Sequence, residues 1–436
     1  MSRKQVVIIG GGFGGLTAAQ ALGKAEIDIV LIDRTNHHLF QPLLYQVATA
    51  ALSPSDIAWP LRTTFRSRPN VRIVMDEVQS IDRMARTVHL RVSPAIPFDI
   101  LVAAPGTRHS YFGHDAWERH APGLKTLADA VRLRENMLLA FEEAERRRAA
   151  THSQDPLTFV IVGGGPTGVE LAGALAEIGW KAMGPDFPRL RLDDLCIMLV
   201  ESGERILSGF SPGLSAKAHA TLERMGVTIK LNSMVSDVRP DGVMVGQEFV
   251  SSGNIFWAAG NRASPILESF KVPQDPSGRV KVQPDLTIPD EPWIFVLGDA
   301  AHCVGVDGKA LPGLAPVAMQ QGRYVARLIR NDTPPDQRRP FAYRNRGTLA
   351  TIGRAKAVAQ IGFLESSGLI AWLLWSIIHI FFLIGFRNRV RVMSEWMWYY
   401  LTFKPGARVI YGQPRPPNGH GADYLATSAE KKHKHE

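Results

Sequence analysis

The stretch that decides the fold is Gly10-Gly11-Gly12-Phe13-Gly14-Gly15, which directly follows the apolar run Val6-Val7-Ile8-Ile9. It fits the pattern G-x-G-x-x-G between a short buried strand and an Ala-rich helical segment. There the first glycine makes a tight turn, the second lets the backbone approach a pyrophosphate, and the third lets helix and strand pack closely. The signature recurs as Gly163-Gly164-Gly165-Pro166-Thr167-Gly168 after Phe159-Val160-Ile161-Val162. The two copies predict two bound dinucleotides.

An acidic residue follows each loop at the end of a second apolar run. Ile27–Ile32 is followed by Asp33, and Cys196–Val200 is followed by Glu201. A carboxylate at this position accepts hydrogen bonds from a ribose, and Glu201 would also repel a 2′-phosphate, which favours NADH over NADPH. Glycine turns and acids at strand ends also occur for purely structural reasons, so each feature alone has that second interpretation.

Length and composition describe a globular chain with more than one domain. It has 436 residues, of which 45% are hydrophobic and 21% are charged. Cys196 and Cys303 are the only cysteines, which argues against a disulfide framework, a C-x-x-C redox pair and a thiolate metal cluster. The first apolar run is too short for a signal peptide, so we expect a reducing compartment such as the cytoplasm.

The net charge of +9 is concentrated at the C-terminal end. From Arg338 onward there are fifteen Lys or Arg and five Asp or Glu, a balance of +10. The same segment contains an uncharged run, residues 368–386, about as long as the ~20 residues that cross a bilayer core. Arg387, Arg389 and Arg391 follow it, and four of the nine tryptophans lie nearby: Trp372, Trp375, Trp396 and Trp398.

Apolar bulk, interfacial aromatics and cations together predict a membrane-attaching segment over residues 368–403. A buried core helix followed by a surface helix is the alternative. Hydropathy does not decide whether the first helix spans the bilayer or lies in its interface.

The order of strands, helices and breakers predicts an α/β fold with two Rossmann-like domains, the second inserted in the first. We expect one dinucleotide domain from residues 1–121 and 290–335 and the other from residues 122–289, with a helix near 127–149. Residues 336–413 would form the membrane-attaching segment, and residues 414–436 a mobile tail.

These residues resemble the two-dinucleotide-binding-domain flavoproteins, and more narrowly the type II NADH:quinone oxidoreductases. The resemblance covers nearly the whole chain. Besides the glycine loops it rests on residues 36–49, Gly168-Val169-Glu170-Leu171, Trp257-Ala258-Ala259-Gly260, Gly298-Asp299 and Ala318-Met319-Gln320-Gln321-Gly322. It implies an enzyme that passes a hydride from NADH to non-covalently bound FAD and two electrons to ubiquinone or menaquinone, without pumping protons.

The resemblance also assigns roles to residues. FAD would contact Gly10, Gly12, Phe13, Gly14, Gly15, Asp33, Arg34, His38, Val78, Asp299, Ala315 and Pro316, and NADH would contact Gly163, Gly165, Gly168 and Glu201. It further implies attachment to the cytoplasmic face of the inner (cytoplasmic) membrane, peripheral or monotopic, and a homodimer. No nucleic-acid partner and no metal site are expected.

Two positions bear on catalysis. Glu170 matches the acid that the family uses for proton delivery, although it could instead complement the dipole of the helix after the second loop. A helix starting near Ala315-Pro316 would direct its positive end at the flavin. The family usually has a glutamine where this chain has Pro316, which leaves Gln320 as a substitute if the helix faces correctly.

Other activities fit less well. A flavin disulfide reductase or a sulfide:quinone oxidoreductase needs cysteines that this chain lacks, and ferredoxin reductases of the superfamily lack the C-terminal apolar run. Pro316 keeps open an NADH oxidoreductase with an unusual or non-quinone acceptor. A low-turnover, redox-responsive flavoprotein scaffold is the alternative outside the enzymes.

Overall fold

The computed structural model describes residues 3–151, 155–402 and 406–410. Its contacts divide the chain into two compact units. The first comprises residues up to 40, 55–110 and 261–347, and the second comprises residues 41–54, 111–260 and the chain from 348 onward. The predicted tail, residues 414–436, lies outside the described residues.

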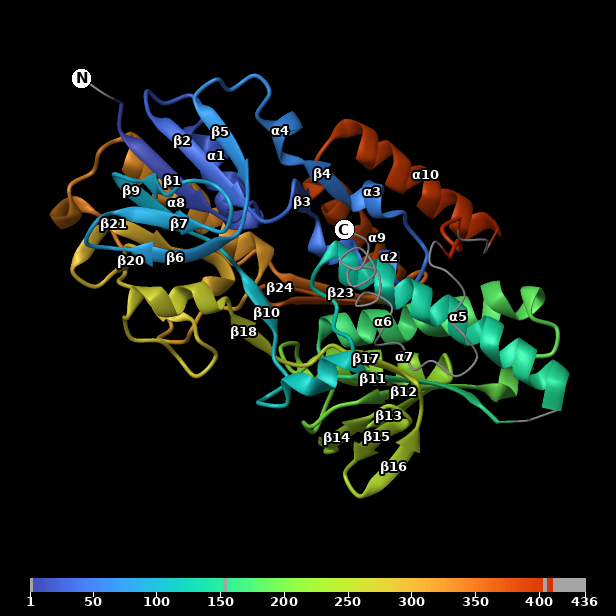
Figure 1. Cartoon of the computed structure of the whole chain (residues 1–436). Helices are drawn as coiled ribbons and strands as arrows, with labels where there is room; N and C mark the ends of the chain where they lie inside the picture. The colour runs from blue at the N-terminus through green and yellow to red at the C-terminus, as the bar shows by residue number, and fades with distance from the viewer. Residues whose placement is uncertain (1–2, 152–154, 403–405, 411–436) are drawn as a thin grey trace, which may run out of the picture. The chain divides into compact units, whose positions relative to one another are not determined.

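The first unit is built on a six-stranded sheet in the order β20-β21-β9-β1-β2-β5 (Figure 1). All neighbours are parallel except the edge pair β20 and β21. Its strands are β1 (Gln5–Ile9), β2 (Asp28–Asp33), β5 (Val71–Met75), β9 (Ile100–Ala103), β20 (Thr287–Ile288) and β21 (Glu291–Val296). Parallel strands covered by helices read as continuous apolar runs, which is why residues 6–9 and 29–32 carry no alternation.

Two helices pack on each other over this sheet. Helix α1 (Phe13–Leu22) leaves the first glycine loop, and α8 (Ala315–Arg330) crosses it where a Cβ on Gly322 would come within 2.5 Å of the carbonyl oxygen of Gly14. Smaller sheets complete the unit. They include β6 (Val78–Asp82) with β7 (Thr87–Leu90) and β8 (Ile96–Pro97), and β10 (Thr107–His109) with β18 (Asn261–Ala263).

The second unit repeats the arrangement with a four-stranded parallel sheet in the order β13-β12-β11-β17. Helix α6 (Pro166–Glu177) leaves the second glycine loop, and the helix expected near 127–149 is confirmed as α5 (Leu127–Thr151). The strands are β11 (Leu157–Val162), β12 (Leu195–Val200), β13 (Val227–Lys230) and β17 (Asn254–Trp257); α7 is Pro212–Arg224, and β14 (Val235–Arg239), β15 (Gly242–Val245) and β16 (Glu248–Ser251) form a side sheet.

The C-terminal part of the second unit begins with the antiparallel sheet β23 (Thr348–Gly353), β24 (Lys356–Ile361) and β25 (Leu364–Gly368). Strand β23 packs on α6 so closely that a Cβ on Gly173 would overlap the carbonyl oxygen of Ile352. Two helices follow, α9 (Leu369–Phe382) and α10 (Phe386–Thr402). The uncharged run 368–386 is therefore one helix and a turn, not a single long helix.

The fold class predicted from the sequence is confirmed. The insertion follows from the strand order, because the first sheet combines strands that precede residues 111–260 in the sequence with strands that follow them. The bounds of the two compact units differ from the predicted domain bounds, and three of the differences have a clear structural cause. Residues 261–289 join the first unit because β18 pairs with β10. Residues 41–54, which contain helix α2 (Leu44–Ala48), join the second because α2 packs on α5 and α6. The chain from 348 joins it through β23. Among the described residues, no helix has the length and hydropathy needed to cross a bilayer.

Candidate functional site

The first glycine loop forms an open cradle at the start of α1. Gly10 adopts φ +96°, and a Cβ there would overlap the carbonyl oxygen of Ala104, while a Cβ on Gly15 would overlap the carbonyl oxygen of Gly10. Next to Gly12 there is open space, with nothing within 4 Å of a Cβ. The N-terminus of α1 has no side-chain cap and no acidic residue in its first turn. Free backbone amides facing open space suit a pyrophosphate.

Asp33, at the end of β2, is fixed by the loop that it follows. Its Oδ2 accepts from the amide of Gly11 at 2.6 Å, and its Oδ1 accepts from the amide of Thr35 at 2.7 Å. A carboxylate has about four acceptor sites, so Oδ2 retains capacity for a hydroxyl donor. Both carboxylate oxygens of Asp33 are therefore held by backbone amides, an arrangement compatible with ribose binding.

His38, in β3 (His37–Leu39), provides a buried acceptor in the same unit. It is only 2% exposed, and its Nδ1 lies 2.9 Å from the carbonyl oxygen of Gly11. A carbonyl can only accept, so Nδ1 carries the hydrogen, and burial lowers the pKa of the ring. The Nε2 atom is then an acceptor, and no described residue is bonded to it. This buried acceptor fits a hydroxyl group of FAD.

A third set of groups surrounds the turn at Gly298-Asp299. The hydroxyl of Thr107 donates to Asp299 at 3.3 Å, and a Cβ on Gly313 would lie 3.1 Å from Asp299 Oδ1. Gln321, 1% exposed, accepts from the amide of Gly298 at 2.7 Å. Sequence reasoning missed this role of Gln321, although the residue stood in a motif it had noted.

The other residues predicted to hold FAD lie in the same unit. Ala315 and Pro316 are the first two residues of α8, as expected, and the N-terminus of α8 has no side-chain cap and no acidic residue in its first turn. Phe13 contacts His38 and Phe40 through its ring. Arg34 is exposed, and Val78 starts β6. The residues present therefore fit FAD.

The second loop reproduces the first at the level of single hydrogen bonds. Gly163 has φ +111°, a Cβ on Gly168 would overlap the carbonyl oxygen of Gly163, and open space adjoins Gly165. Glu201 accepts from the amide of Gly164 at 2.6 Å through Oε2 and from the amide of Gly203 at 2.7 Å through Oε1. This cradle suits a second dinucleotide with free ribose hydroxyls.

Glu170 lies further along α6 than its sequence position suggested. It is the fifth residue of the helix, and the first turn contains no acid, which weakens the explanation that it complements the helix dipole. Burial raises the pKa of its carboxyl to about 8, and a backbone hydrogen bond from Thr351 in β23 partly offsets this. The pKa of Tyr45 is also raised, by burial first and then by the charge of Glu170.

Gln320 is engaged elsewhere. Its Nε2 donates to the carbonyl oxygen of Arg344 at 3.0 Å, and its Oε1 accepts from the amide of Arg344 at 3.0 Å. Both ends of the amide thus hold a neighbouring backbone segment. The prediction that Gln320 replaces the family glutamine stays a prediction, and this geometry favours a structural role.

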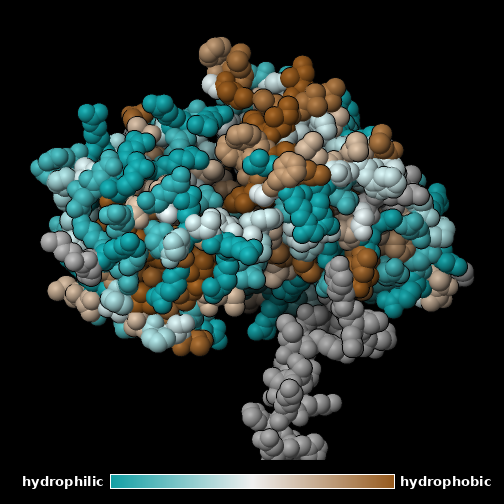
Figure 2. All heavy atoms as spheres, turned by 90° about the horizontal axis from the view of Figure 1, so that it is seen from above, coloured by the Kyte–Doolittle hydropathy of each residue, from teal (hydrophilic) through white to brown (hydrophobic). Residues whose placement is uncertain are grey.

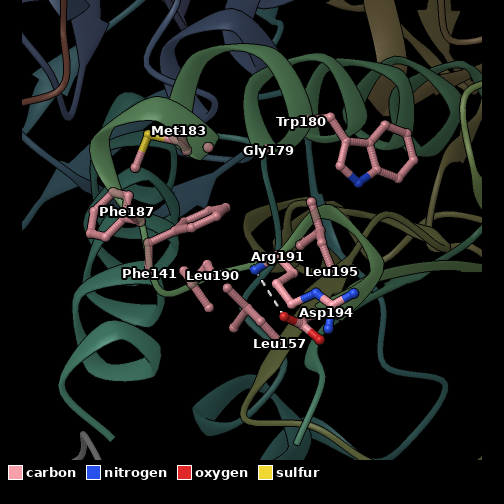
Figure 3. A pocket seen from close by; sticks show the side chains of 11 residues that line it. Phe141, Leu157, Gly179, Trp180, Met183, Phe187, Leu190, Arg191, Asp194 and Leu195 are labelled. Carbon is pink, nitrogen blue, oxygen red and sulfur yellow. Dashed lines mark hydrogen bonds between the residues drawn. The ribbon is translucent and has the colours of Figure 1, made fainter. Parts of the chain in front are cut away.

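A separate pocket lies between α5 and η3 (Ile178–Met183), lined by Phe141, Trp180 and Phe187 among others (Figure 3). Its volume is about 20 Å³, room for about one water molecule. None of the predicted site residues lines it, so it is a gap in packing and not a dinucleotide site. Among the described residues there is no group of three metal-ligating side chains.

Helices α9 and α10 expose apolar side chains along their length. Figure 2, which draws the molecule from above, shows hydrophobic side chains gathered mainly at the upper edge of a face that is otherwise largely hydrophilic. Two of the four tryptophans expected at a membrane interface are buried instead, Trp375 at 1% and Trp396 at 8% exposure. The exposed apolar side chains are Leu369, Ile370, Leu373, Ile377, Phe381, Phe386, Val390, Met393, Met397, Trp398 and Leu401.

Comparison with known proteins agrees with this geometry. Residues 4–322 match the pyridine nucleotide-disulphide oxidoreductase family, and residues 345–403 match the NDH2 C-terminal domain. The chain is 41% identical to the type II NADH:quinone oxidoreductase NdhA of Mycobacterium tuberculosis, over 90% of this chain and 86% of that protein. It is 40% identical to the type II NADH:quinone oxidoreductase Ndh of the same organism, over 94% and 91%.

Solved structures show the same fold. NDH2 of Plasmodium falciparum, solved in complex with NADH, superposes with a TM-score of 0.85 at 17% identity and covers 94% of this chain and all of that one. The sulfide:quinone oxidoreductase of Aquifex aeolicus superposes with a TM-score of 0.71 at 19% identity, over 88% of this chain and 92% of that one. By sequence identity and family match together, the chain belongs to the type II NADH:quinone oxidoreductase family of flavoproteins.

Proposed function

We propose that this chain oxidises NADH through a resident FAD and reduces a membrane quinone. The observation that carries the proposal is the pair of cradles, each with an open glycine loop and an acid held by two backbone amides. The mycobacterial relatives named type II NADH:quinone oxidoreductases support the same activity.

The first unit would hold FAD. The amides around Gly12 would bind its pyrophosphate, Asp33 a ribose, and His38 Nε2 a hydroxyl hydrogen, while Asp299 would contact the ribityl or phosphate portion. When bound, FAD accepts a hydride from the nicotinamide and passes two electrons to the quinone. The uncapped N-terminus of α8 at Ala315 supplies positive potential in this unit for the charge that reduction produces.

The second unit would hold NADH through Gly163, Gly165, Gly168 and Glu201. The carboxylate of Glu201 leaves acceptor capacity on Oε2 for a ribose hydroxyl. A 2′-phosphate at the same place would meet a fixed negative charge, so NADPH would bind more weakly than NADH.

Glu170 would hold the proton that a quinone needs. With a pKa near 8 the carboxyl is mostly protonated at neutral pH, and it can release a proton without a large cost. Overall, NADH, one proton and a quinone give NAD⁺ and a quinol. The hydride of NADH accounts for the two electrons and one hydrogen of the quinol, and Glu170 Oε would supply the remaining proton and be recharged from solvent.

We further propose that the exposed apolar face of α9 and α10 binds the bilayer surface and delivers the quinone. The face is flanked by the exposed side chains of Arg387 and Arg391, which would meet anionic headgroups. Attachment would be peripheral or monotopic, on the cytoplasmic face, through residues 368–403, with a homodimer as the assembly.

Each predicted domain has a function in the proposal. The first Rossmann-like unit would be the FAD domain, the second the NADH domain, and residues 368–403 the membrane-attaching part. Pro316 has no polar side chain where relatives would offer an amide, which favours as the second candidate function an NADH oxidoreductase whose acceptor is unusual.

The test uses the full chain purified in detergent. The proposal expects a flavin absorption spectrum, rapid anaerobic bleaching by NADH but not NADPH, and reoxidation by ubiquinone and menaquinone analogues. It also expects co-sedimentation with vesicles containing anionic phospholipid. A colourless protein, or a yellow one that excess NADH does not bleach, would contradict the proposal. Reoxidation by soluble acceptors only would favour the second candidate function.

A further inference from the structure

A buried chain of hydrogen bonds joins the C-terminal helix α10 to helix α2. The indole Nε1 of Trp396 donates to Oε1 of Gln46 at 2.7 Å, and Nε2 of Gln46 donates to the hydroxyl of Tyr45 at 2.8 Å. The three side chains are 8%, 8% and 6% exposed. All three belong to the second unit.

The donors and acceptors of these hydrogen bonds can be arranged in only one way. An indole nitrogen can only donate, so Trp396 must face the oxygen of the Gln46 amide. The amide nitrogen then faces Tyr45 and can only donate, which makes the phenol oxygen an acceptor. The hydroxyl hydrogen of Tyr45 is left to donate elsewhere, and in the described part of the chain it has no acceptor.

The hydroxyl hydrogen of Tyr45 lies near Glu170, the residue proposed above to supply a proton. Helix α2 packs on α6, and Glu170 of α6 lies close enough to Tyr45 for its ionised form to help raise the pKa of the Tyr45 hydroxyl. The ring of Trp396 lies 5.4 Å from that of Trp375 in α9. A buried phenol with an unused hydrogen is costly to retain unless something accepts it.

We propose that the Tyr45 hydroxyl donates a hydrogen bond to a carbonyl oxygen of the bound quinone, and that Trp396, acting through Gln46, is a positioning residue that fixes the direction of this donation. The inference rests on the proposed function. It adds a polar donor for the quinone to the unit that also contains Glu170.

The contribution is electrostatic. Negative charge develops on the carbonyl oxygen as the quinone takes up electrons, and a donor already oriented toward that oxygen stabilises it. The O–H bond of Tyr45 stays intact, so the electrons and protons of the reaction come from the sources proposed above. Helix α10, whose other face is the exposed apolar one, thereby orients a group at the site of chemistry.

The experiment compares Tyr45→Phe, Trp396→Phe and the double variant, each as detergent-purified holoenzyme. Without the indole N–H, the Gln46 amide can rotate by half a turn and accept the Tyr45 hydrogen. We expect each single variant to lower quinone turnover by about 10- to 100-fold, the effect of losing a hydrogen bond to a charged group. The double variant should be no slower than Tyr45→Phe, and anaerobic flavin reduction by NADH should be unchanged in all three.

Two further variants distinguish the loss of this hydrogen bond from a general folding defect. Gln46→Glu keeps the bond to Trp396 but accepts the Tyr45 hydrogen, so it should be as slow as Tyr45→Phe. Trp375→Phe removes a buried indole N–H that has no partner among the described residues, and it should stay within about twofold of the parent.

Several outcomes would overturn the inference. These are normal quinone turnover in Tyr45→Phe, an effect of Trp396→Phe that persists undiminished in the Tyr45→Phe background, or an equal loss in Trp375→Phe. If the parent reduces its flavin with NADH but no quinone reoxidises it, the proposed function itself fails, and the inference fails with it.

Discussion

Replacing Glu170 by glutamine tests whether this carboxyl carries a proton to the quinone. Burial raises its pKa from 4.5 to about 8. Between these two values the unfolded chain ionises Glu170 while the folded protein keeps it neutral. Folding stability therefore falls as pH rises from about 4.5 to 8 and is level above pH 8. At about 1.36 kcal/mol per pKa unit, the full cost at pH 9 is about 5 kcal/mol, an upper limit because water entry would reduce it.

Glutamine keeps the shape and removes the ionisation. Glu170→Gln should thus unfold at the same temperature as the parent at pH 4.5 and at a higher temperature at pH 9. Glu170→Gln should lower quinone turnover although it raises stability at high pH. Quinone turnover of the parent should fall about tenfold per pH unit above pH 8, as the protonated fraction falls, whereas the variant should be slow and show no inflection there.

The assay is steady-state quinone reduction from pH 6 to 9.5, with stopped-flow flavin reduction by NADH as the reference. Glu177→Gln is the matched control, because Glu177 also lies on α6, also has a pKa raised by burial, and accepts from the amide of Arg354. It should alter the pH dependence of stability and leave the inflection near pH 8 in place. An inflection that survives in Glu170→Gln, or that disappears in Glu177→Gln, would refute the reasoning.

Three other changes follow from the site and the packing. Glu201→Ala should raise the NADH concentration needed for half-maximal flavin reduction by about 10- to 100-fold while the flavin content stays constant; joint loss of both would contradict two separate cradles. Pro316→Gln should give quinone turnover at least equal to that of the parent, and a slower variant would show that Pro316 is no handicap. Gly173→Ala should lower the thermal midpoint strongly, because its Cβ would overlap the carbonyl of Ile352, whereas Gly213→Ala, which has open space, should not; equal midpoints would disprove the close contact.

Much of the fold was predictable because both glycine loops are local signals. The turn, the helix start and the acid at the next strand end lie within about 40 residues of each other, so a short window of sequence contains the whole cradle. Asp33 and Glu201 each lie where this pattern predicts, bonded to the middle glycines Gly11 and Gly164.

Long-range contacts were not predictable in the same way. Trp396 reads as one of several interfacial tryptophans, and only the fold shows that it bonds to Gln46, a residue 350 positions earlier. Hydropathy likewise gave one apolar run over residues 368–386, whereas the backbone turns at Leu383. The role of Gln321 depends on α8 packing beside Gly298, which composition does not reveal.

The two cradles have the same glycine loop and differ in the residues that cover it. This difference would suit a resident cofactor in the first cradle and an exchanging substrate in the second. After Asp33 the chain folds back through β3 and β4 (Ala58–Pro60), which buries His38 and brings Phe40 against the ring of Phe13. After Glu201 the chain also returns to its loop, where the amide of Leu207 donates to the carbonyl oxygen of Gly164, but Ser202 is exposed and Pro166, at the position of Phe13, is exposed too. A ligand enclosed by more contacts dissociates more slowly, because each contact must be lost before it leaves. We therefore expect the repeat to recognise a dinucleotide twice, and the aromatic contacts that follow Asp33 to slow the dissociation of the first one.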